Sequence, residues 1–302
     1  MTGAELARRL APRVRGRVIE NAPLAPLTTF RVGGPADVLV EAESVDDLMA
    51  VGELLRDGVS VAIVGRGSNL LVADAGYRGV ALKLGRAFRT HEETERGLRL
   101  GGAVYLPAAA RLTARIARTG FEFAAEIPAT FGGAVRMNAG AHDRCMADVL
   151  VSADVVDMAA GARRTMSVED LEYGYRRSSL GAADIVVEGE VLLERADARV
   201  VAGRIASYLE WRREHQPPGR SAGSVFVNPP GVAAGRLIDE GGVKGMRVGG
   251  AEISPLHANF IVAAPDARAA DVWEVINRAR AVVRQRTGIS LDCEVRFLGD
   301  FE

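Results

Sequence analysis

Apolar residues near the start of the chain change from strand spacing to helical spacing and back. After a short N-terminal helix, the apolar run at 38–40 suits a buried strand, and Ser44 with Asp47 forms a capping box for the helix that follows. Apolar residues between 48 and 55 recur on one helical face, and a second buried strand is expected at 61–64. The pattern predicts a strand, helix, strand unit.

The middle of the chain continues to mix strands with helices. Pro107 suits the first turn of a helix, because that position needs no backbone donor, and Gly120 is expected to end this helix. The other elements expected here are strands at 79–84, 97–100 and 185–193, a hairpin of strands at 149–158 and 163–166, and a short helix between Ser167 and Gly174.

The last hundred residues show the same mixture. The elements expected are a helix at 197–214, a domain joint at 215–220, a helix at 233–240, strands at 246–248 and 259–263, a long helix at 271–286 and a final strand at 291–297. This order of helices and strands predicts an α+β fold.

Composition excludes several classes of function. The chain has 302 residues, 48% hydrophobic and 25% charged, with a formal net charge of −1 and no long basic run, so a nucleic-acid-binding surface is not expected. No run is apolar enough for a membrane span or a signal peptide. Cys145 and Cys293 have no metal or redox spacing, which favours a reducing cytoplasm, and the four histidines are too scattered to predict a metal site.

Residues 127–141 form a glycine-rich, apolar stretch that is unsuited to a solvated loop. Gly132, Gly133 and Gly140 lack a Cβ, so a flat or charged cofactor could approach the main chain there. A turn, a short core strand at 134–137 and a second turn explain the stretch equally well. The stretch alone does not choose between the two interpretations.

A second glycine-rich stretch, residues 65–72, directly follows a predicted strand. Gly65, Gly67 and Ser68 can aim successive backbone N–H groups at a diphosphate. Leu70 stands where a Rossmann fingerprint needs its third glycine, which excludes that motif. An ordinary β-turn is the commoner explanation of such a loop.

Three further residues could carry chemistry, and each also has a simpler explanation. Ser224 lies in a glycine-flanked turn without the G-x-S-x-G pattern of a hydrolase, so its hydroxyl could serve the turn alone. Arg176 could be an ordinary surface arginine. Alternation in the final strand places Glu294 beside Arg296 on the polar face, which is either solvated or lines a cleft.

Six segments taken together resemble one enzyme family. They are TTFRVGG at 28–34, GRGSNL at 65–70, IPATFGGAVRMNAGA at 127–141, YRRS at 175–178, SAGSVFVNP at 221–229 and EVR at 294–296. In this order and spacing they resemble the UDP-N-acetylenolpyruvoylglucosamine reductase (UDP-N-acetylmuramate dehydrogenase) family, over residues 17–299. The resemblance implies a two-lobed FAD-binding domain of the p-cresol methylhydroxylase type followed by an α+β substrate-binding domain. The implied boundaries are 1–85 for the first lobe, to which 291–302 returns, 86–200 for the second lobe, and 201–290 for the substrate domain.

The resemblance implies an FAD- and NADPH-dependent oxidoreductase of peptidoglycan precursor synthesis, and hence of cell wall biogenesis, cell shape and cell division, in the cytoplasm. NADPH would reduce FAD, and the enolpyruvyl ether of UDP-N-acetylglucosamine would then take hydride from flavin N5 at its vinyl methylene carbon. Arg176 and Glu294, the latter protonated or sharing a proton, would stabilise the resulting enolate, and Ser224 would protonate it.

The resemblance also assigns the binding residues. Those implied to hold FAD are Gly65, Arg66, Gly67, Ser68, Asn69, Leu70, Ile127, Pro128, Thr130, Gly132, Gly133, Ala134, Asn138, Ala139, Gly140 and Arg296. Those implied to bind the substrate are Arg176, Gly223, Ser224, Phe226, Asn228, His257 and Glu294. No metal is implied.

Two positions depart from the family pattern. Val227 stands where members commonly carry a basic residue, whose role would pass to Arg220 or Lys244. Ala129 replaces the glycine usual after Ile-Pro, and alanine is strained there only if its φ is positive. The chain runs from the strand ending near Glu194 straight into the next helix, so it resembles the shorter branch of the family, which lacks an inserted tyrosine loop.

Two other functions stay open. One is another FAD-dependent oxidase of the same fold that acts on a sugar or hydroxy acid. The other is a non-catalytic nucleotide-sugar binding protein on a reductase scaffold, against which the intact Arg176, Ser224 and Glu294 argue. The expected partners are a nucleotide sugar and NADPH, without nucleic acid or membrane, and a monomer is favoured.

Overall fold

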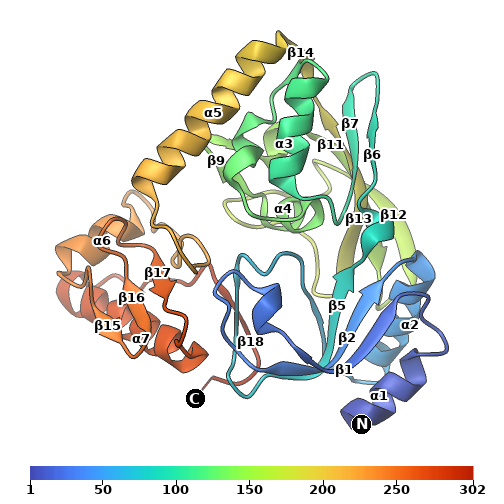
Figure 1. The fold of residues 1–302 in the computed structure, drawn as a ribbon, viewed down its shortest axis with the longest axis horizontal. Coiled ribbons are helices and arrows are strands. Elements are labelled where there is room, and N and C mark those ends of the chain that lie inside the picture. The colour runs from blue at the N-terminus through green and yellow to red at the C-terminus, as the bar shows by residue number, and fades with distance from the viewer. Residues whose placement is uncertain (302) are drawn as a thin grey trace. The chain divides into compact units, whose positions relative to one another are not determined.

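The computed structural model describes residues 1–301, which form two compact units (Figure 1). The segments of unit 1 are Met1–Asn21, Asp37–Arg66 and Gly79–Arg212, and those of unit 2 are Ala22–Ala36, Gly67–Arg78 and Arg213–Glu302. The mixture of helices and strands in both units confirms the predicted α+β class. The division at 85, 200 and 290 stays a prediction.

The first sheet of unit 1 has the strand order β1-β2-β5-β3. Its strands are β1 (Arg17–Pro23), β2 (Pro35–Ala42), β3 (Val61–Ile63) and β5 (Tyr77–Leu84), and the helices near it are α1 (Gly3–Leu10) and α2 (Val45–Arg56). Ser44 caps α2 as predicted, and the apolar face of α2 packs with Val38 and Val80 in one buried cluster. The strand, helix, strand prediction is correct, because β2, α2 and β3 follow one another at the expected positions and both strands belong to this sheet, where β3 pairs in parallel with β5.

The second sheet of unit 1 is antiparallel, in the order β12-β11-β13-β7-β6. Its strands are β6 (His91–Glu93), β7 (Gly97–Gly101), β11 (Leu150–Asp157), β12 (Ala162–Ser167) and β13 (Asp184–Leu192). The predicted hairpin is β11 with β12. The helices α3 (Leu106–Arg115), α4 (Phe131–Met137) and α5 (Ala198–His215) contribute apolar residues to the same core, centred on Phe121, Phe123 and Phe131.

Short elements complete unit 1. They are the paired strands β8 (Arg118–Thr119) and β14 (Glu194–Arg195), the paired strands β9 (Gly140–Ala141) and β10 (Arg144–Cys145), and the 3₁₀ helices η2 (Arg86–Phe88), η3 (Glu122–Glu126) and η4 (Met146–Asp148).

Unit 2 contains a small antiparallel sheet, a parallel strand pair and two α-helices. Its elements are η1 (Ala25–Leu27), β4 (Leu70–Val72), α6 (Ala234–Glu240), β15 (Arg247–Val248), β16 (Ala251–Ile253), β17 (Ile261–Ala263), α7 (Ala269–Thr287) and β18 (Arg296–Leu298). The Asp74 carboxylate accepts hydrogen bonds from the first backbone N–H groups of α7, and Gly288, with φ of 73°, ends this helix. The apolar stripe of α7 packs on Leu71 and Val295 in a single core.

The structure corrects four predictions of secondary structure. Helix α3 ends at Arg115, with Ile116 as its C-cap, so Gly120 does not end it. Residues 134–137 belong to helix α4 instead of a strand, because the Thr130 hydroxyl accepts from the Gly133 N–H and caps a helical turn. Ser167 and Asp170 do bond reciprocally, but the residues after them form turns instead of a helix. The final strand is regular only over β18, although the predicted alternation of burial from 291 to 297 is present.

Within residues 1–301 no helix is long and apolar enough to cross a bilayer. The same residues contain no cluster of three or more His, Cys, Asp or Glu side chains able to hold a metal ion.

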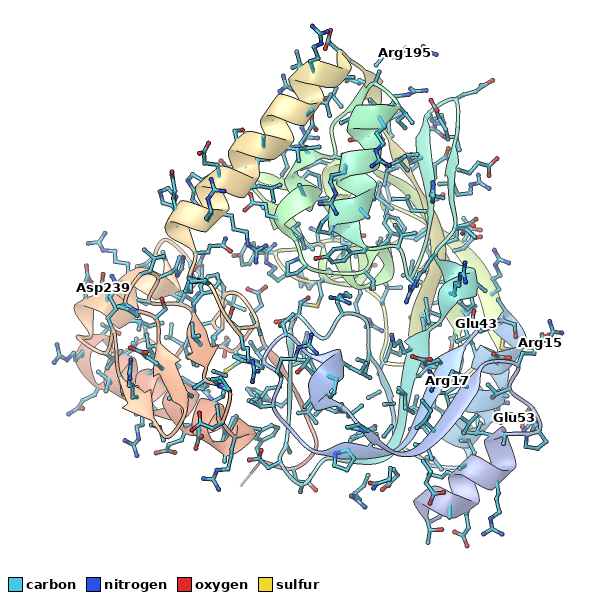
Figure 2. All side chains as sticks on the ribbon, viewed as in Figure 1. Arg15, Arg17, Glu43, Glu53, Arg195 and Asp239 are labelled. Atoms are coloured by element: carbon cyan, nitrogen blue, oxygen red, sulfur yellow. The ribbon has the colours of Figure 1, made fainter. Side chains whose placement is uncertain are left out.

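A buried carboxylate fixes the chain between α1 and β1. Asp47, fully buried in the first turn of α2, accepts hydrogen bonds from the backbone N–H groups of Arg15, Gly16 and Glu43 and from the Ser44 hydroxyl. Burial by itself would raise the pKa of Asp47, but these hydrogen bonds outweigh it and the pKa lies below its usual value. Arg15, by contrast, projects at the edge of this region (Figure 2).

We expect Asp47→Asn to lower the free energy of unfolding by about 2 kcal/mol at pH 7, because the amide places a donor against bound N–H groups. Since the folded-state pKa of Asp47 is depressed, its contribution is present above the unfolded-state pKa and is lost as the pH falls through the folded-state pKa. The deficit of the variant should therefore shrink in acid. Urea unfolding measures this, with exposed Asp46→Asn as the control; equal effects of the two variants would contradict the prediction.

Candidate functional site

Three segments that are distant in sequence are joined by hydrogen bonds in unit 2. The Asn69 side-chain amide donates to the Glu294 carbonyl oxygen at 3.0 Å, and the Arg296 N–H donates to the Asn69 carbonyl at 3.0 Å. The Glu294 N–H donates to the carbonyl of Val225, the residue next to Ser224, at 2.8 Å. Unit 2 therefore brings together the loop at 67–70, the strip at 224–226 and the strand at 294–296.

Gly67 turns the first of these segments against the 28–34 segment. Its φ is 58°, and a Cβ on it would lie 2.3 Å from the Leu27 carbonyl oxygen, so only glycine fits. The N–H of Thr29 donates to the Gly67 carbonyl at 3.2 Å. The 28–34 segment thus packs against the candidate diphosphate loop at Gly67 and holds it in place.

Asn259 holds the strip that carries Ser224. Its side-chain oxygen accepts from the Phe226 N–H and its amide donates to the Phe226 carbonyl, both at 2.9 Å. The bridge between Ser224 and Phe260 extends the same pairing. Gly223 has φ of 74° with open space around its missing Cβ, and the hydroxyl of Ser224 has no hydrogen-bond partner within the described residues 1–301.

Two other predicted substrate residues lie in the same unit. Asn228 accepts from the Ala234 N–H at 3.0 Å and so helps to begin α6. His257 packs on Phe260 with ring centroids 4.6 Å apart, and its Nδ1 accepts from a backbone N–H. Burial lowers the pKa of His257, its own backbone hydrogen bond opposes this, and the Lys244 ammonium lowers it further.

Arg220 and Lys244 were expected to take the role of the basic residue that Val227 replaces, and both have structural contacts of their own. Lys244 forms an ion pair with Asp239 at 3.0 Å, and Arg220 donates to the Pro265 carbonyl oxygen at 3.2 Å. Lys244 is nevertheless the cation that acts on His257.

The backbone of residues 65–69 can receive an anion. The N–H groups of these five residues donate to no acceptor among residues 1–301. Gly65 and Arg66 belong to unit 1, and Gly67, Ser68 and Asn69 belong to unit 2. In unit 2, Gly67 is buried and Ser68 and Asn69 are half-buried, and N–H groups without partners are costly there, so this part of the loop is suited to diphosphate oxygens.

In unit 1 the 127–141 stretch folds around helix α4. Gly65 faces the helix cap so closely that a Cβ would lie 2.9 Å from the Thr130 hydroxyl. Backbone bonds from Phe131 and Gly132 to residues 104 and 102 fix the start of the helix. Ala129 does not have a positive φ, so alanine is accommodated without strain at this departure from the family pattern.

Asn138 joins this stretch to the turn that carries Arg176. Asn138 ends α4 in the left-handed conformation, and its amide donates to the Gly174 carbonyl at 3.1 Å. Gly174 and Arg177 close a tight turn with Arg176 at its tip, at φ of 57°. The Arg176 guanidinium lies over the Tyr175 ring and donates to the Gly140 carbonyl at 3.1 Å.

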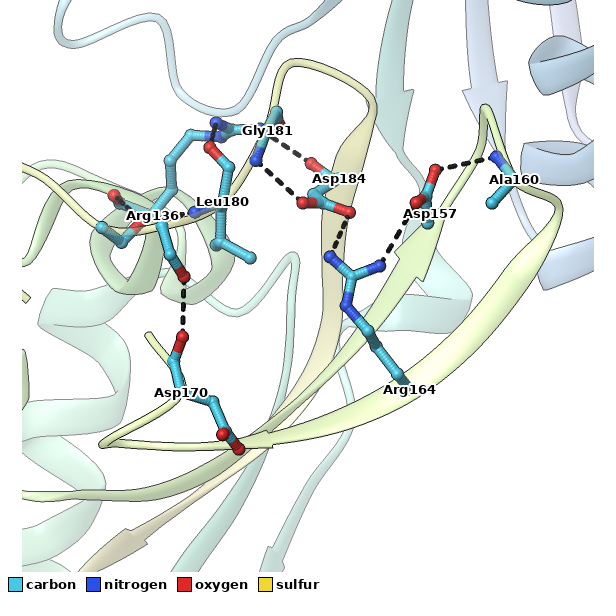
Figure 3. Close-up of polar contacts among 10 residues, drawn as sticks. Arg136, Asp157, Ala160, Arg164, Asp170, Leu180, Gly181 and Asp184 are labelled. Carbon is cyan, nitrogen blue, oxygen red and sulfur yellow. Dashed lines mark hydrogen bonds and ion pairs between the residues drawn. The ribbon is translucent and has the colours of Figure 1, made fainter. Parts of the chain in front are cut away.

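Arg136 provides a second connection between α4 and this turn. Its guanidinium donates to the carbonyls of Leu180, Gly181 and Asp184, as Figure 3 shows for the residues drawn. The Ser178 hydroxyl donates back to the Arg136 carbonyl at 2.7 Å. Unit 1 thus brings Arg176 together with Asn138 and Gly140.

The chain matches two family models. One, described as the UDP-N-acetylenolpyruvoylglucosamine reductase C-terminal domain, matches residues 214–298, and the other, an FAD binding domain, matches residues 36–167. The chain is 42% identical over 290 residues to the UDP-N-acetylenolpyruvoylglucosamine reductase of Heliobacterium modesticaldum, covering 95% of this chain and 92% of that protein. The chain belongs to the UDP-N-acetylenolpyruvoylglucosamine reductase family.

Other relatives agree with this assignment. The reductase of Bacillus subtilis is 37% identical over 294 residues, covering 96% of this chain and 97% of that protein. The crystal structure of the Thermus caldophilus reductase has a TM-score of 0.82 and 37% identity, over 94% of this chain and 99% of the other. A Physcomitrella patens protein titled BBE-like 1 has a TM-score of 0.58 at 12% identity, over 94% and 90% of the two chains, which shows a shared fold alone.

The family's FAD suits the residues present. The unpaired N–H groups at 67–69 fit a diphosphate, and Gly133 at the start of α4 leaves the main chain approachable. Arg66 lies over the Tyr105 ring, with its guanidinium carbon 5.2 Å from the ring centroid. Which atoms of FAD each residue contacts stays a prediction.

Sequence reasoning missed several residues that hold this arrangement. Asn259 and Arg136 act through hydrogen bonds to distant backbone groups, and no local pattern marks such bonds. Glu126 and His142 also escaped notice, although they flank the 127–141 stretch directly. An ionisable residue at each end of a glycine-rich apolar segment is the signal that could have found them.

Gly67→Ala should destabilise the protein and weaken FAD binding more than Gly223→Ala does. Both residues have positive φ, which costs an alanine roughly 1–2 kcal/mol, but only at Gly67 would the Cβ also meet a backbone oxygen. Thermal unfolding and the FAD content of purified protein measure the difference. Equal loss in the two variants would show that Gly67 is not constrained by its neighbours.

Proposed function

We propose that this protein reduces the enolpyruvyl group of UDP-N-acetylglucosamine-enolpyruvate to UDP-N-acetylmuramate, with Arg176, Ser224 and Glu294 as its catalytic residues. The observation that carries the roles in unit 2 is the set of hydrogen bonds joining Asn69, Val225 and Glu294. The protein is an FAD- and NADPH-dependent oxidoreductase of peptidoglycan precursor synthesis, in keeping with its family.

Bound FAD, once reduced by NADPH, supplies the hydride that adds to the vinyl methylene carbon of the substrate. The chain's own residues must then manage the charge and proton that this addition creates. Hydride addition places an extra electron pair on the carbon next to the substrate carboxylate, so negative charge spreads onto the carboxylate oxygens. The reaction is complete when that carbon receives a proton.

Arg176 suits the stabilisation of this enolate. A guanidinium is always charged and can meet a carboxylate with two parallel donors. The tight turn, the bond to Gly140 and the Tyr175 ring hold the side chain before substrate arrives, so little reorganisation is needed during the reaction. We assign Glu294 the task of holding the same oxygens.

Ser224 is assigned as the proton donor. Its hydroxyl has no hydrogen-bond partner within residues 1–301, so the proton is not committed to a neighbouring carbonyl. A hydroxyl is a weak acid, but the enolate that it meets is strongly basic, and a proton from solvent can restore the hydroxyl afterwards. Gly223 and Asn259 fix the strip that presents it.

Binding roles are part of the same proposal. We assign the backbone of residues 65–69 to the FAD diphosphate, α4 with its flanking residues to the flavin, and Phe226, Asn228 and His257 to the substrate. We further propose that the protein acts as a monomer in the cytoplasm. The oxidase and the non-catalytic binding protein considered as alternatives are not favoured, because relatives named as the reductase match nearly the whole chain.

The function as a whole is tested by colour. Purified protein should be yellow, should bleach anaerobically with NADPH, and should recover its colour when the enolpyruvyl nucleotide sugar is added. Steady oxygen consumption with another sugar or hydroxy acid would favour the oxidase. Protein that stays colourless after reconstitution with FAD would contradict the proposal.

Ser224→Ala should retain the rate of flavin reduction by NADPH and lose at least about a hundredfold in the rate of flavin reoxidation by substrate, the lower range for a general acid. Stopped-flow absorbance resolves the two half-reactions. Ser221→Ala, in the same glycine-containing turn, serves as the matched control. An unimpaired second half-reaction in Ser224→Ala would remove Ser224 from the mechanism.

A further inference from the structure

A pair of side chains closes the two ends of the 127–141 segment. Glu126 is the last residue of η3 and immediately precedes Ile127, and His142 immediately follows Ala141. The His142 Nε2 and a Glu126 carboxylate oxygen form a hydrogen bond. The Glu126 side chain is only 3% exposed and that of His142 19%, so this contact is shielded from solvent.

Helix α5 covers this pair from outside. The Tyr208 ring stacks on the His142 ring with centroids 3.9 Å apart and an interplanar angle of 10°. The Trp211 ring meets the same imidazole edge-on at 5.2 Å. The Arg212 guanidinium donates to the Glu126 backbone carbonyl. Consecutive turns of one helix therefore hold both members of the pair.

His142 adopts a backbone conformation that its side chain disfavours. It lies with Asp143 in the turn between β9 and β10, and the two residues have φ of 52° and 57°. These are the dihedrals of a type I′ turn, which favours asparagine and glycine. The contacts of His142 with Glu126, Tyr208 and Trp211 are the interactions present to offset this strain.

The segment closed by this pair carries the residues assigned to the flavin. Within it, the Gly140 carbonyl accepts from Arg176 two residues before His142, and Asn138 holds the Gly174 turn. A shift of the 140–142 backbone would therefore move the acceptor of Arg176.

We propose that Glu126 and His142 are positioning residues that fix the flavin-binding segment, and that α5 locks them in place through Tyr208 and Trp211. The proposal rests on the assignment of residues 127–140 to FAD. The pair does not touch the reacting atoms. It sets the affinity for FAD and the environment of the flavin by holding both ends of one loop.

The chain offers a matched control in Glu122. This carboxylate lies in the same 3₁₀ helix, is 5% exposed, and faces the same helix α5 through Arg204 at 3.6 Å. Its hydrogen bonds go to the Thr119 hydroxyl and the Gly120 N–H, which lie outside the flavin segment. A substitution of Glu122 therefore measures the effect of losing a buried carboxylate beneath α5 that has no contact with the flavin segment.

The test compares apoprotein variants by FAD titration, followed by the visible spectrum of the bound flavin. His142→Phe keeps a ring against Tyr208 and Trp211 but loses the bond to Glu126, and we expect its dissociation constant for FAD to rise about tenfold with a shifted flavin spectrum. Glu122→Gln should lower the unfolding temperature and change the FAD dissociation constant by less than about twofold.

A second variant keeps the test decisive if His142→Phe does not fold. His142→Asn suits the positive φ, so it should fold, while binding FAD about tenfold more weakly. If either histidine variant has wild-type FAD affinity and a wild-type flavin spectrum, this inference is wrong but the proposed function still stands. Wild-type apoprotein that binds no FAD would overturn the proposed function together with it.

Discussion

The parallel pairing of β18 with β4 is the interaction on which the candidate site of unit 2 depends. Arg296 pairs with Leu70, and the Asn69 amide reaches the Glu294 carbonyl across a sequence separation of 225 residues. A parallel pair of three-residue strands has little stability by itself. It persists because Leu71 and Val295, fully buried beside it, belong to the core built on α7. The position of Glu294 is therefore a consequence of core packing.

Close approach of main chain to main chain is the second constraint. A Cβ on Gly67 would meet the backbone of residues 27 and 28, so this position does not tolerate a side chain, whereas a Cβ on Gly65 would meet the Thr130 hydroxyl at 2.9 Å. The loop at 65–69 keeps its N–H groups out of secondary structure. A loop held so closely cannot rearrange to pair these donors internally, which leaves them available to an anion. The same close packing both holds the loop in place and leaves its N–H groups unpaired.

Local patterns were enough to predict most of the fold, because the elements concerned are specified by their own residues. The Ser44 cap and the apolar stripe of α7 each act within one element. The stretch at 134–137 was ambiguous for a physical reason: its alanine, valine, arginine and methionine suit either state, and a hydroxyl at Thr130 decided for the helix. The short β16 went unpredicted because it gains its definition from pairing with β17.

The candidate site was predictable only in part, because its residue types are informative but their supports are distant. Motifs identified Arg176, Ser224 and Glu294 through resemblance, yet nothing near Phe226 in sequence shows that Asn259 holds it. Nor does the sequence reveal which members of a glycine-rich segment face open space. Those facts depend on contacts made after folding, which a single sequence does not display.

Several residues with an unfavourable backbone conformation lie in or next to the flavin segment of unit 1. Their presence indicates that function, and not the conformational preference of each residue, determined the backbone here. Asn138, His142 and Arg176 all have positive φ although none is glycine. Each is held by a side-chain contact to another part of the region: Asn138 to Gly174, His142 to Glu126, and Arg176 to Gly140. Strained residues persist where their surroundings over-determine them. The three contacts link the buried Glu126, through the 138–142 backbone, to the guanidinium assigned to the substrate. The position of Arg176 therefore depends on the conformation of this loop.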